Sequence, residues 1–266
     1  MTLKSVFKKK SLGILIHPSS LPEGSYCGTF GEGAKNEVVL GKGVYNNYGI
    51  AQNGFTISSI QFALHYMFEN KRTLHSFLTN VSKYTKKGGY FIGTCYDGQK
   101  IYSKLKTQNN VELWSNKTKI WQVKKKYDDD DDAFLKNEYD ENTKLGYKIS
   151  VYQETINKEF DEYLVHFDYF IKIMNDYGFV IQTNKMNGIQ SFQTLYDEMM
   201  ALHESEQTQY GMANQMSPQE KEISFLNNYF IFQKKHDIIR SLYTEEEGID
   251  YSIGKPKKLN KTFTLV

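Results

Sequence analysis

Three polar side chains stand where an apolar run ends. Residues 55–64 read FTISSIQFAL, and Gln61, His65 and Tyr66 lie at or just after the end of this run. In open α/β sheets, ligands bind in the crevice beyond the carboxyl ends of the strands. Polar residues at this place therefore indicate side chains that face a ligand. The alternative is that His65 and Tyr66 begin a helix and are hydrogen-bonded within the core.

The elements that would position these residues follow from hydrophobic periodicity. The run 55–64 is rich in β-branched and apolar residues and predicts a buried strand. A helix should follow and end at Gly88 and Gly89, and YFIGT at 90–94 predicts a second strand. The apolar positions of this helix are Leu74, Phe77, Leu78 and Val81. Strand, helix, strand is the order of an α/β crossover, which builds a parallel sheet.

Later segments predict an antiparallel excursion and more α/β elements. Segments 118–127 and 147–156 flank the acidic run Asp128–Asp132 and should pair as antiparallel strands. Residues 165–179 predict a helix, a glycine stop and a strand. A helix over 190–205 should bury Phe192, Leu195, Met199 and Leu202. Ser217, Pro218 and Glu220 predict a capping box before a final strand at 228–232.

The bulk composition excludes several classes of protein. The 266 residues are 39% hydrophobic, which is enough for a globular core. A formal charge of +2 is too small for nucleic-acid binding by bulk electrostatics. The cysteines Cys27 and Cys95 lack the number and spacing of a disulfide framework or a zinc site. No run approaches the ~20 apolar residues of a membrane span. We therefore expect a soluble, intracellular protein with no membrane partner.

The chain resembles a known family in several consecutive segments. FTISSIQFALHYMFEN, NVSKYTKKGGYFIGTCYDG and the stretch from VYQETINKEF to MSPQEKEISFLNNYFIFQKK are similar to the catalytic domain of mRNA cap guanine-N7 methyltransferases, most closely those of large DNA viruses. The resemblance implies an α/β fold, an incomplete Rossmann-like class I methyltransferase sheet with an antiparallel insertion. It also implies a partial methyltransferase domain at 32–235, preceded by an unrelated segment (1–31) and followed by a basic tail (236–266).

The resemblance implies roles for eight residues. S-adenosyl-L-methionine, the methyl donor, would contact Gln61, Phe62 and Tyr66, and the cap guanine would contact His65, Cys95, Tyr96, Glu162 and Asn227. A carboxylate such as that of Glu162 can accept hydrogen bonds from both donors on the Watson–Crick edge of guanine. The alternative places Glu162 on a solvated strand edge beside Glu159 and Asp161. Relatives carry a proline near Tyr96, so this wall of the site differs.

The chain departs from the family in its first part. The family's donor site needs a strand that ends in a Gly-rich turn and an acidic residue that binds the ribose, and we find neither here. We therefore expect no useful methylation of GpppRNA by this chain alone. Its partners would be capped RNA and either a guanylyltransferase module or the missing N-terminal half. The alternative function is a non-catalytic cap-binding or stimulatory module.

A second, shorter resemblance lies at the N-terminus. SLGILIHPSSLPEGSYCGTFG, residues 11–31, is similar to the start of 4-α-glucanotransferases. The chain has no length for their barrel and none of their later acidic segments, so we do not expect carbohydrate chemistry. A viral protein would act in the host cytoplasm, in a viral factory or virion. A cellular one would act in the nucleus or cytoplasm.

Overall fold

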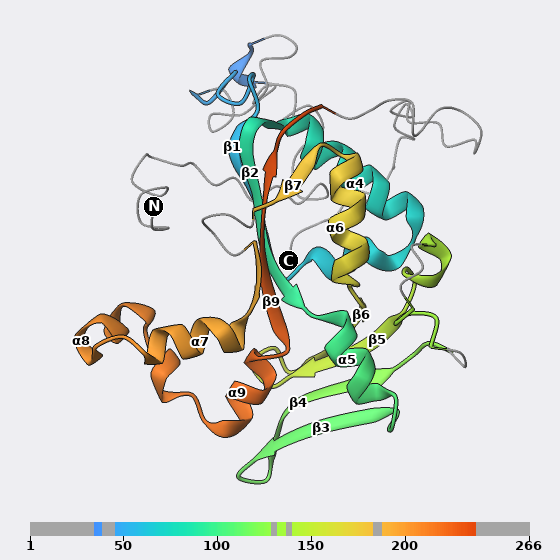
Figure 1. Ribbon diagram of the computed structural model, residues 1–266, viewed down its shortest axis with the longest axis vertical. Coiled ribbons are helices and arrows are strands. Elements are labelled where there is room, and N and C mark those ends of the chain that lie inside the picture. Colours follow the sequence, from blue (N-terminus) through green and yellow to red (C-terminus); the bar gives the residue numbers. More distant parts are fainter. Residues whose placement is uncertain (1–34, 39–45, 129–131, 137–139, 183–187, 238–266) are drawn as a thin grey trace.

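The computed structural model of the chain contains two β-sheets joined by short helices (Figure 1). The structure describes residues 35–38, 46–128, 132–136, 140–182 and 188–237. The expectations for 1–31 and for most of the basic tail lie outside these residues. Within the described residues, no helix is both long enough and apolar enough to cross a membrane.

The predicted α/β crossover is confirmed. Strand β1 (Phe55–Gln61) leads through the 3-10 helix η1 (Leu64–Glu69) and helix α4 (Lys71–Tyr84) to β2 (Thr85–Tyr96), and β1 and β2 are parallel. The helix stop was wrong. Helix α4 already ends at Tyr84, and Gly88 and Gly89 lie inside β2. Thr85, the first residue of β2, has an extended backbone, and its hydroxyl pairs with Ser58 Oγ at 2.6 Å.

The first sheet is completed by antiparallel strands. Strand β9 (Asn227–Lys234) pairs with β2, and β7 (Phe179–Ile181) and β8 (Ile189–Ser191) both pair with β9. Helix α6 (Phe167–Asp176) ends at Tyr177, and Gly178 follows with a φ of 86°, so the predicted glycine stop is confirmed. Helices α4 and α6 cover the same face of this sheet (Figure 1). The buried aromatic rings Phe91, Phe170 and Phe230 fill the space beneath them.

The second sheet is larger than the sequence predicted. Strands β4 (Thr118–Lys125) and β5 (Lys148–Gln153) pair as expected, and β3 (Asn110–Ser115) and β6 (Lys158–Tyr163) extend the sheet on either side. Helix α5 (Gly98–Leu105) connects the first sheet to β3, and the short helix η2 (Glu141–Thr143) precedes β5. The second sheet has a separate hydrophobic core, which contains Trp121, Val123 and Val151.

A helical lobe lies between β8 and β9. It contains α7 (Phe192–Met200), α8 (Glu204–Gln207), η3 (Thr208–Tyr210), η4 (Ala213–Gln215) and α9 (Pro218–Ser224). The capping box of α9 is confirmed, since Ser217 and Glu220 bond each other's backbone. The inward orientation of Leu195 was wrong: its side chain is 36% exposed, and Met199 is the buried residue of α7.

The close approach of β1, β2 and β9 makes a prediction about Gly93. A Cβ at this position would collide with the Ile60 carbonyl oxygen and the Phe230 ring. We expect Gly93→Ala to lower the free energy of unfolding by about 1–3 kcal/mol. Gly88 is the matched control, because it lies on the same strand with nothing within 4 Å and only its φ of 80° opposes a side chain. Urea unfolding of both variants tests this, and a smaller loss for Gly93→Ala than for Gly88→Ala would contradict it.

Candidate functional site

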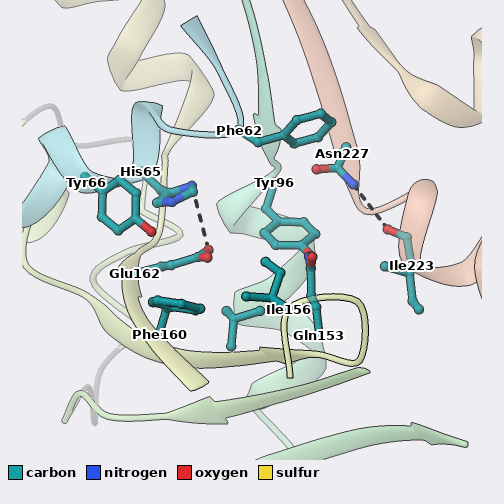
Figure 2. A pocket seen from close by; sticks show the side chains of 11 residues that line it. Phe62, His65, Tyr66, Tyr96, Gln153, Ile156, Phe160, Glu162, Ile223 and Asn227 are labelled. Carbon is teal, nitrogen blue, oxygen red and sulfur yellow. Dashed lines mark hydrogen bonds and ion pairs between the residues drawn. The ribbon is translucent and has the colours of Figure 1, made fainter. Parts of the chain in front are cut away.

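A cavity of about 400 Å³ lies between the two sheets (Figure 2). This volume is within the range of small-molecule sites, roughly 300–1,000 Å³. Residues from η1, the ends of β1 and β2, strands β5 and β6, and the α9–β9 corner surround it. The lining residues are Phe62, His65, Tyr66, Tyr96, Val151, Gln153, Ile156, Phe160, Glu162, Ile223 and Asn227.

Glu162 and His65 face each other across the cavity. Glu162 lies on β6, opposite Ile149 of β5, and its carboxylate therefore points to the inner face of the second sheet. His65 lies on η1, and its Nδ1 is 3.7 Å from Glu162 Oε2. Only 7% of the His65 side chain and 12% of the Glu162 side chain are exposed. Two ionisable groups from distant parts of the sequence thus share one buried space.

Several buried polar atoms of the cavity have no hydrogen-bond partner. Among the described residues these are both ring nitrogens of His65, Oε2 of Glu162 and Oδ1 of Asn227. The amide nitrogen of Asn227 donates to the carbonyl oxygens of Ile223 and Ser224, so the side chain is oriented and its oxygen is left unpaired. A buried polar group without a partner costs about 1–3 kcal/mol. Their concentration in one cavity indicates a site built to hydrogen-bond a ligand.

Burial favours the neutral form of both ionisable groups, and it shifts their pKa values in opposite directions. Desolvation raises the pKa of Glu162 to about 7 and lowers that of His65 to about 4. His65 is therefore neutral at neutral pH, with one ring nitrogen as donor and the other as acceptor. The Glu162 carboxyl group is poised to lose its proton when a ligand offers hydrogen-bond donors.

Aromatic rings form much of the cavity wall. Figure 2 shows Tyr66 and Tyr96 on either side of the Glu162 carboxylate, with Phe62 above and Phe160 below. The Tyr96 hydroxyl oxygen accepts hydrogen bonds from Trp121 Nε1 and Gln153 Nε2, both at 3.0 Å, which fixes this ring. Flat aromatic walls of this kind suit a planar ligand such as a nucleobase.

Phe62 is held in a strained conformation. Its φ is 50°, which is unusual for a bulky residue, and its side chain is 55% exposed. Its N–H donates to the carbonyl oxygen of Thr94 at 2.8 Å, so the residue extends the β1–β2 ladder before the chain turns into η1. Strain of this kind concentrates at functional sites.

The structure brings together six of the eight residues predicted from the sequence. Phe62, His65, Tyr66, Tyr96, Glu162 and Asn227 all line the cavity. Cys95 does not: its side chain is 0% exposed in the core under α4 and α6, because alternate residues of β2 face opposite sides of the sheet. Gln61 lies outside the cavity, where its amide donates to Ser59 Oγ and accepts from Thr94 Oγ1.

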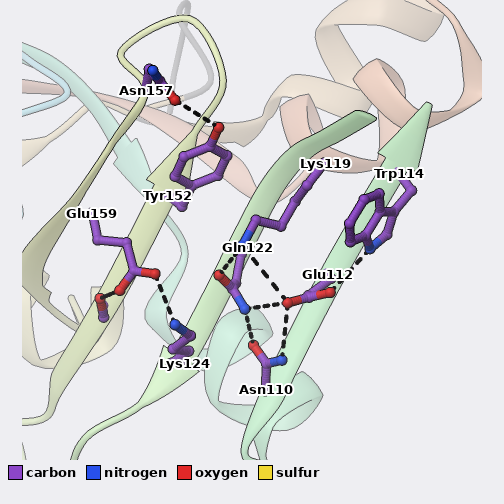
Figure 3. A network of polar contacts seen from close by, with 10 residues as sticks. Asn110, Glu112, Trp114, Lys119, Gln122, Lys124, Tyr152, Asn157 and Glu159 are labelled. Carbon is purple, nitrogen blue, oxygen red and sulfur yellow. Dashed lines mark hydrogen bonds and ion pairs between the residues drawn. The ribbon is translucent and has the colours of Figure 1, made fainter. Parts of the chain in front are cut away.

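The surroundings of His65 and Glu162 differ from those that the two alternatives describe. His65 is buried, but it makes none of the core hydrogen bonds that the alternative requires. Glu159 of β6 points to the outer face of the second sheet, where it pairs with Lys124 at 2.8 Å (Figure 3). Asp161 shares that face and pairs with Lys126 at 2.7 Å. Glu162 points the other way and is not solvated as they are.

Sequence reasoning missed five residues of the cavity: Val151, Gln153, Ile156, Phe160 and Ile223. The sequence contained a pattern that could have identified one of them. Phe160 stands two residues before Glu162, and residues two apart on a strand share a face. The others come from β5, its turn and α9, and no local pattern placed these elements beside η1.

Comparisons with known proteins point to one protein family. A family model described as the mRNA (guanine-N(7))-methyltransferase domain matches residues 32–235. The chain is 30% identical over 132 residues to an mRNA cap guanine-N(7) methyltransferase of Aspergillus niger, covering 50% of this chain and 20% of that protein. The Saccharomyces cerevisiae protein of the same name is 32% identical over 123 residues, covering 46% of this chain and 27% of its own length. The chain thus spans about a quarter of these relatives.

Solved structures show only a loose likeness. An S-adenosylmethionine-dependent methyltransferase of Clostridium acetobutylicum has 12% identity and a TM-score of 0.38, covering 69% of this chain and 60% of that one. The CcbJ methyltransferase of Streptomyces caelestis has 10% identity and a TM-score of 0.37, covering 77% and 63%.

A pair of buried histidines allows a test of the site. His75 bonds Tyr177 Oη at 2.6 Å and Glu141 Oε1 at 2.7 Å, whereas His65 has no such partner. We expect His75→Ala to lower the free energy of unfolding by about 2–3 kcal/mol, because it leaves buried polar groups unpaired. His65→Ala should change it by less than about 1 kcal/mol. Chemical denaturation measures both, and equal losses would place His65 in the structural core.

The raised pKa of Glu162 predicts a pH-dependent stability. The carboxyl group has an ordinary value of 4.5 and a folded value of about 7, so folding favours its protonated form. The cost of ionising this buried group lowers the free energy of unfolding. That cost is absent below pH 4.5, grows as the pH rises, and reaches about 3 kcal/mol above pH 7. Glu162→Gln should therefore gain stability relative to the parent between pH 4.5 and 7 and hold that gain above pH 7. Thermal unfolding across this range checks it, and a difference independent of pH would contradict the shift.

Proposed function

Because the chain belongs to the mRNA (guanine-N(7))-methyltransferase family, we propose that its cavity binds the guanine of an RNA cap for methyl transfer to N7. The observation that carries this proposal is the unpaired, buried carboxylate of Glu162 beside His65. A ligand that satisfies these atoms recovers the cost of burying them.

Guanine offers the matching pattern of donors and acceptors. Its N1–H and 2-amino groups are adjacent donors, which one carboxylate can accept together. Adenine has no such pair, so Glu162 would discriminate between the two purines. Neutral His65 has one N–H, which can donate to the neighbouring carbonyl oxygen O6. The rings of Phe62, Tyr66, Tyr96 and Phe160 can hold the purine plane.

The reaction makes modest demands on the protein. Guanine N7 carries a lone pair and no proton, so no general base is required, and the protein's task is to orient N7 and favour positive charge on the purine. The methyl donor that family membership implies is S-adenosylmethionine, which supplies an electrophilic methyl group when bound. Phe62 and Tyr66 line the cavity, and Gln61 stands exposed at the carboxyl end of β1. These residues fit one side of a donor at the place where open α/β sheets bind ligands.

We keep the non-catalytic cap-binding module as a second candidate. The observation in its favour is that the residues proposed to face guanine share one cavity while Gln61 lies outside it. Binding of radiolabelled S-adenosylmethionine to the chain distinguishes the two, since only the enzyme requires it. Capped RNA is the proposed partner in both cases. A viral source and a guanylyltransferase partner also stay proposals, as the relatives described above are fungal.

The carboxylate of Glu162 provides the main test. We expect Glu162→Gln to weaken binding of the cap analogue GpppA by about 1.5–3 kcal/mol, because the amide cannot accept both guanine donors. Glu159→Gln is the matched control, since it removes a charge from the same strand on its outer face. Isothermal titration of the parent and both variants measures the effect. Equal affinity of the parent and Glu162→Gln would refute the assignment.

A further inference from the structure

We propose that the cavity selects a positively charged purine and therefore binds 7-methylguanosine, the product of the proposed reaction, more tightly than guanosine. This inference rests on the proposed function and adds to it a charge preference of the same site. Three features of the described residues support it: the neutral surroundings of Glu162, the aromatic walls and the charge that N7 methylation creates.

Among the described residues that line the cavity, the ionisable groups around the Glu162 carboxylate are neutral at neutral pH. From η1, His65 has its pKa lowered to about 4 and Tyr66 has its pKa raised, in both cases chiefly by burial. From β2, burial raises the pKa of Tyr96 to about 12. The described residues that line the cavity include no Lys or Arg. A cationic ligand would therefore supply the counter-charge that the protein does not provide.

The aromatic walls act in the same direction. The faces of aromatic rings carry partial negative charge, and they attract cations that lie within about 6 Å of the ring centre. Phe62, Tyr66, Tyr96 and Phe160 approach the cavity from different sides (Figure 2). A flat cation stacked among them gains this attraction in addition to ordinary stacking.

Methyl transfer creates such a cation. The N7 lone pair forms the new N–C bond while the methyl–sulfur bond breaks, and its electron pair goes to sulfur. The positive charge of the sulfonium thereby passes to the purine ring. A site that stabilises this charge as it develops also stabilises the product that carries it. The same carboxylate and rings thus favour the transition state and hold the product.

The binding of three nucleotides can distinguish the effect of the positive charge from the effect of the methyl group's shape. GTP is neutral in its base, 7-methyl-GTP has a cationic base, and 7-methyl-7-deaza-GTP carries the same methyl group without the charge. We expect 7-methyl-GTP to bind the parent chain at least about tenfold more tightly than either of the others in isothermal titrations at neutral pH. In Glu162→Gln this preference should fall at least about threefold, whereas Glu159→Gln should keep it.

Each outcome bears on the proposal. Equal binding of the two methylated nucleotides would show that the methyl group and not the charge is recognised, and would overturn it. Equal binding of GTP and 7-methyl-GTP would also overturn it while leaving guanine recognition intact. An unchanged preference in Glu162→Gln would refute the role of the carboxylate. If none of the three nucleotides binds, the proposed function fails together with the inference.

Discussion

The burial of one carboxylate without a cationic partner is the constraint on which the site depends. Glu162 lies between two sheets, close to His65, and the facing atoms of both residues have no hydrogen-bond partner among the described residues. A buried charge of this kind is held only if the surrounding fold is stable enough to bear its cost. Two separate hydrophobic cores provide that stability. One lies under α4 and α6, and the other lies between the second sheet and α5.

The other carboxylates of the second sheet differ from Glu162 in having lysine partners. On its outer face, Lys119 lies near Glu112 and Lys124 pairs with Glu159 (Figure 3). Lys126 and Lys148 pair with Asp161 on the same face. Exposed pairs of this kind contribute little to stability, but they leave each carboxylate with a cation nearby. The strand alternation of β6 places Glu162 on the opposite face, away from all of these lysines. The available cations thus neutralise the solvent face, and the cavity keeps the unpaired carboxylate.

Local patterns in the sequence predicted those elements whose residues determine their own conformation. The crossover from β1 to β2, the glycine stop after α6 and the Ser217 capping box are of this kind. Strands β3 (NVELWS) and β6 (KEFDEY) were not predicted, because both contain charged residues and neither presents an apolar run. Gly88 and Gly89 were misread, since glycine can mark a bulge in a strand as well as a helix end, and the register of β1 against β2 shifts between Phe55 and Ile57, beside these glycines.

The site could be predicted only in part, because neighbouring strand residues face opposite sides of a sheet and because key residues are far apart in the sequence. A shift of one residue on a strand reverses the face, so Cys95 and Tyr96 could not both line the cavity, and the structure selects Tyr96. His65 and Glu162 are far apart in the chain, and no local pattern joins them. Only the family resemblance suggested that they meet, and the packing of η1 against β6 brings them within 3.7 Å.

The turn at Phe62 explains how one strand end can serve two sides of a site. Gln61 points outward to Ser59 and Thr94, while His65 points into the cavity four residues later. The chain can reverse so sharply because Phe62 adopts a φ of 50° and still donates its N–H to Thr94, which anchors the turn to β2. Such a conformation costs about 1–3 kcal/mol in a non-glycine residue. A glycine would remove this strain, but it would also remove the exposed ring that lies at the boundary between Gln61 and the cavity. The strain is therefore best understood as the consequence of placing an aromatic side chain between the proposed donor and guanine positions.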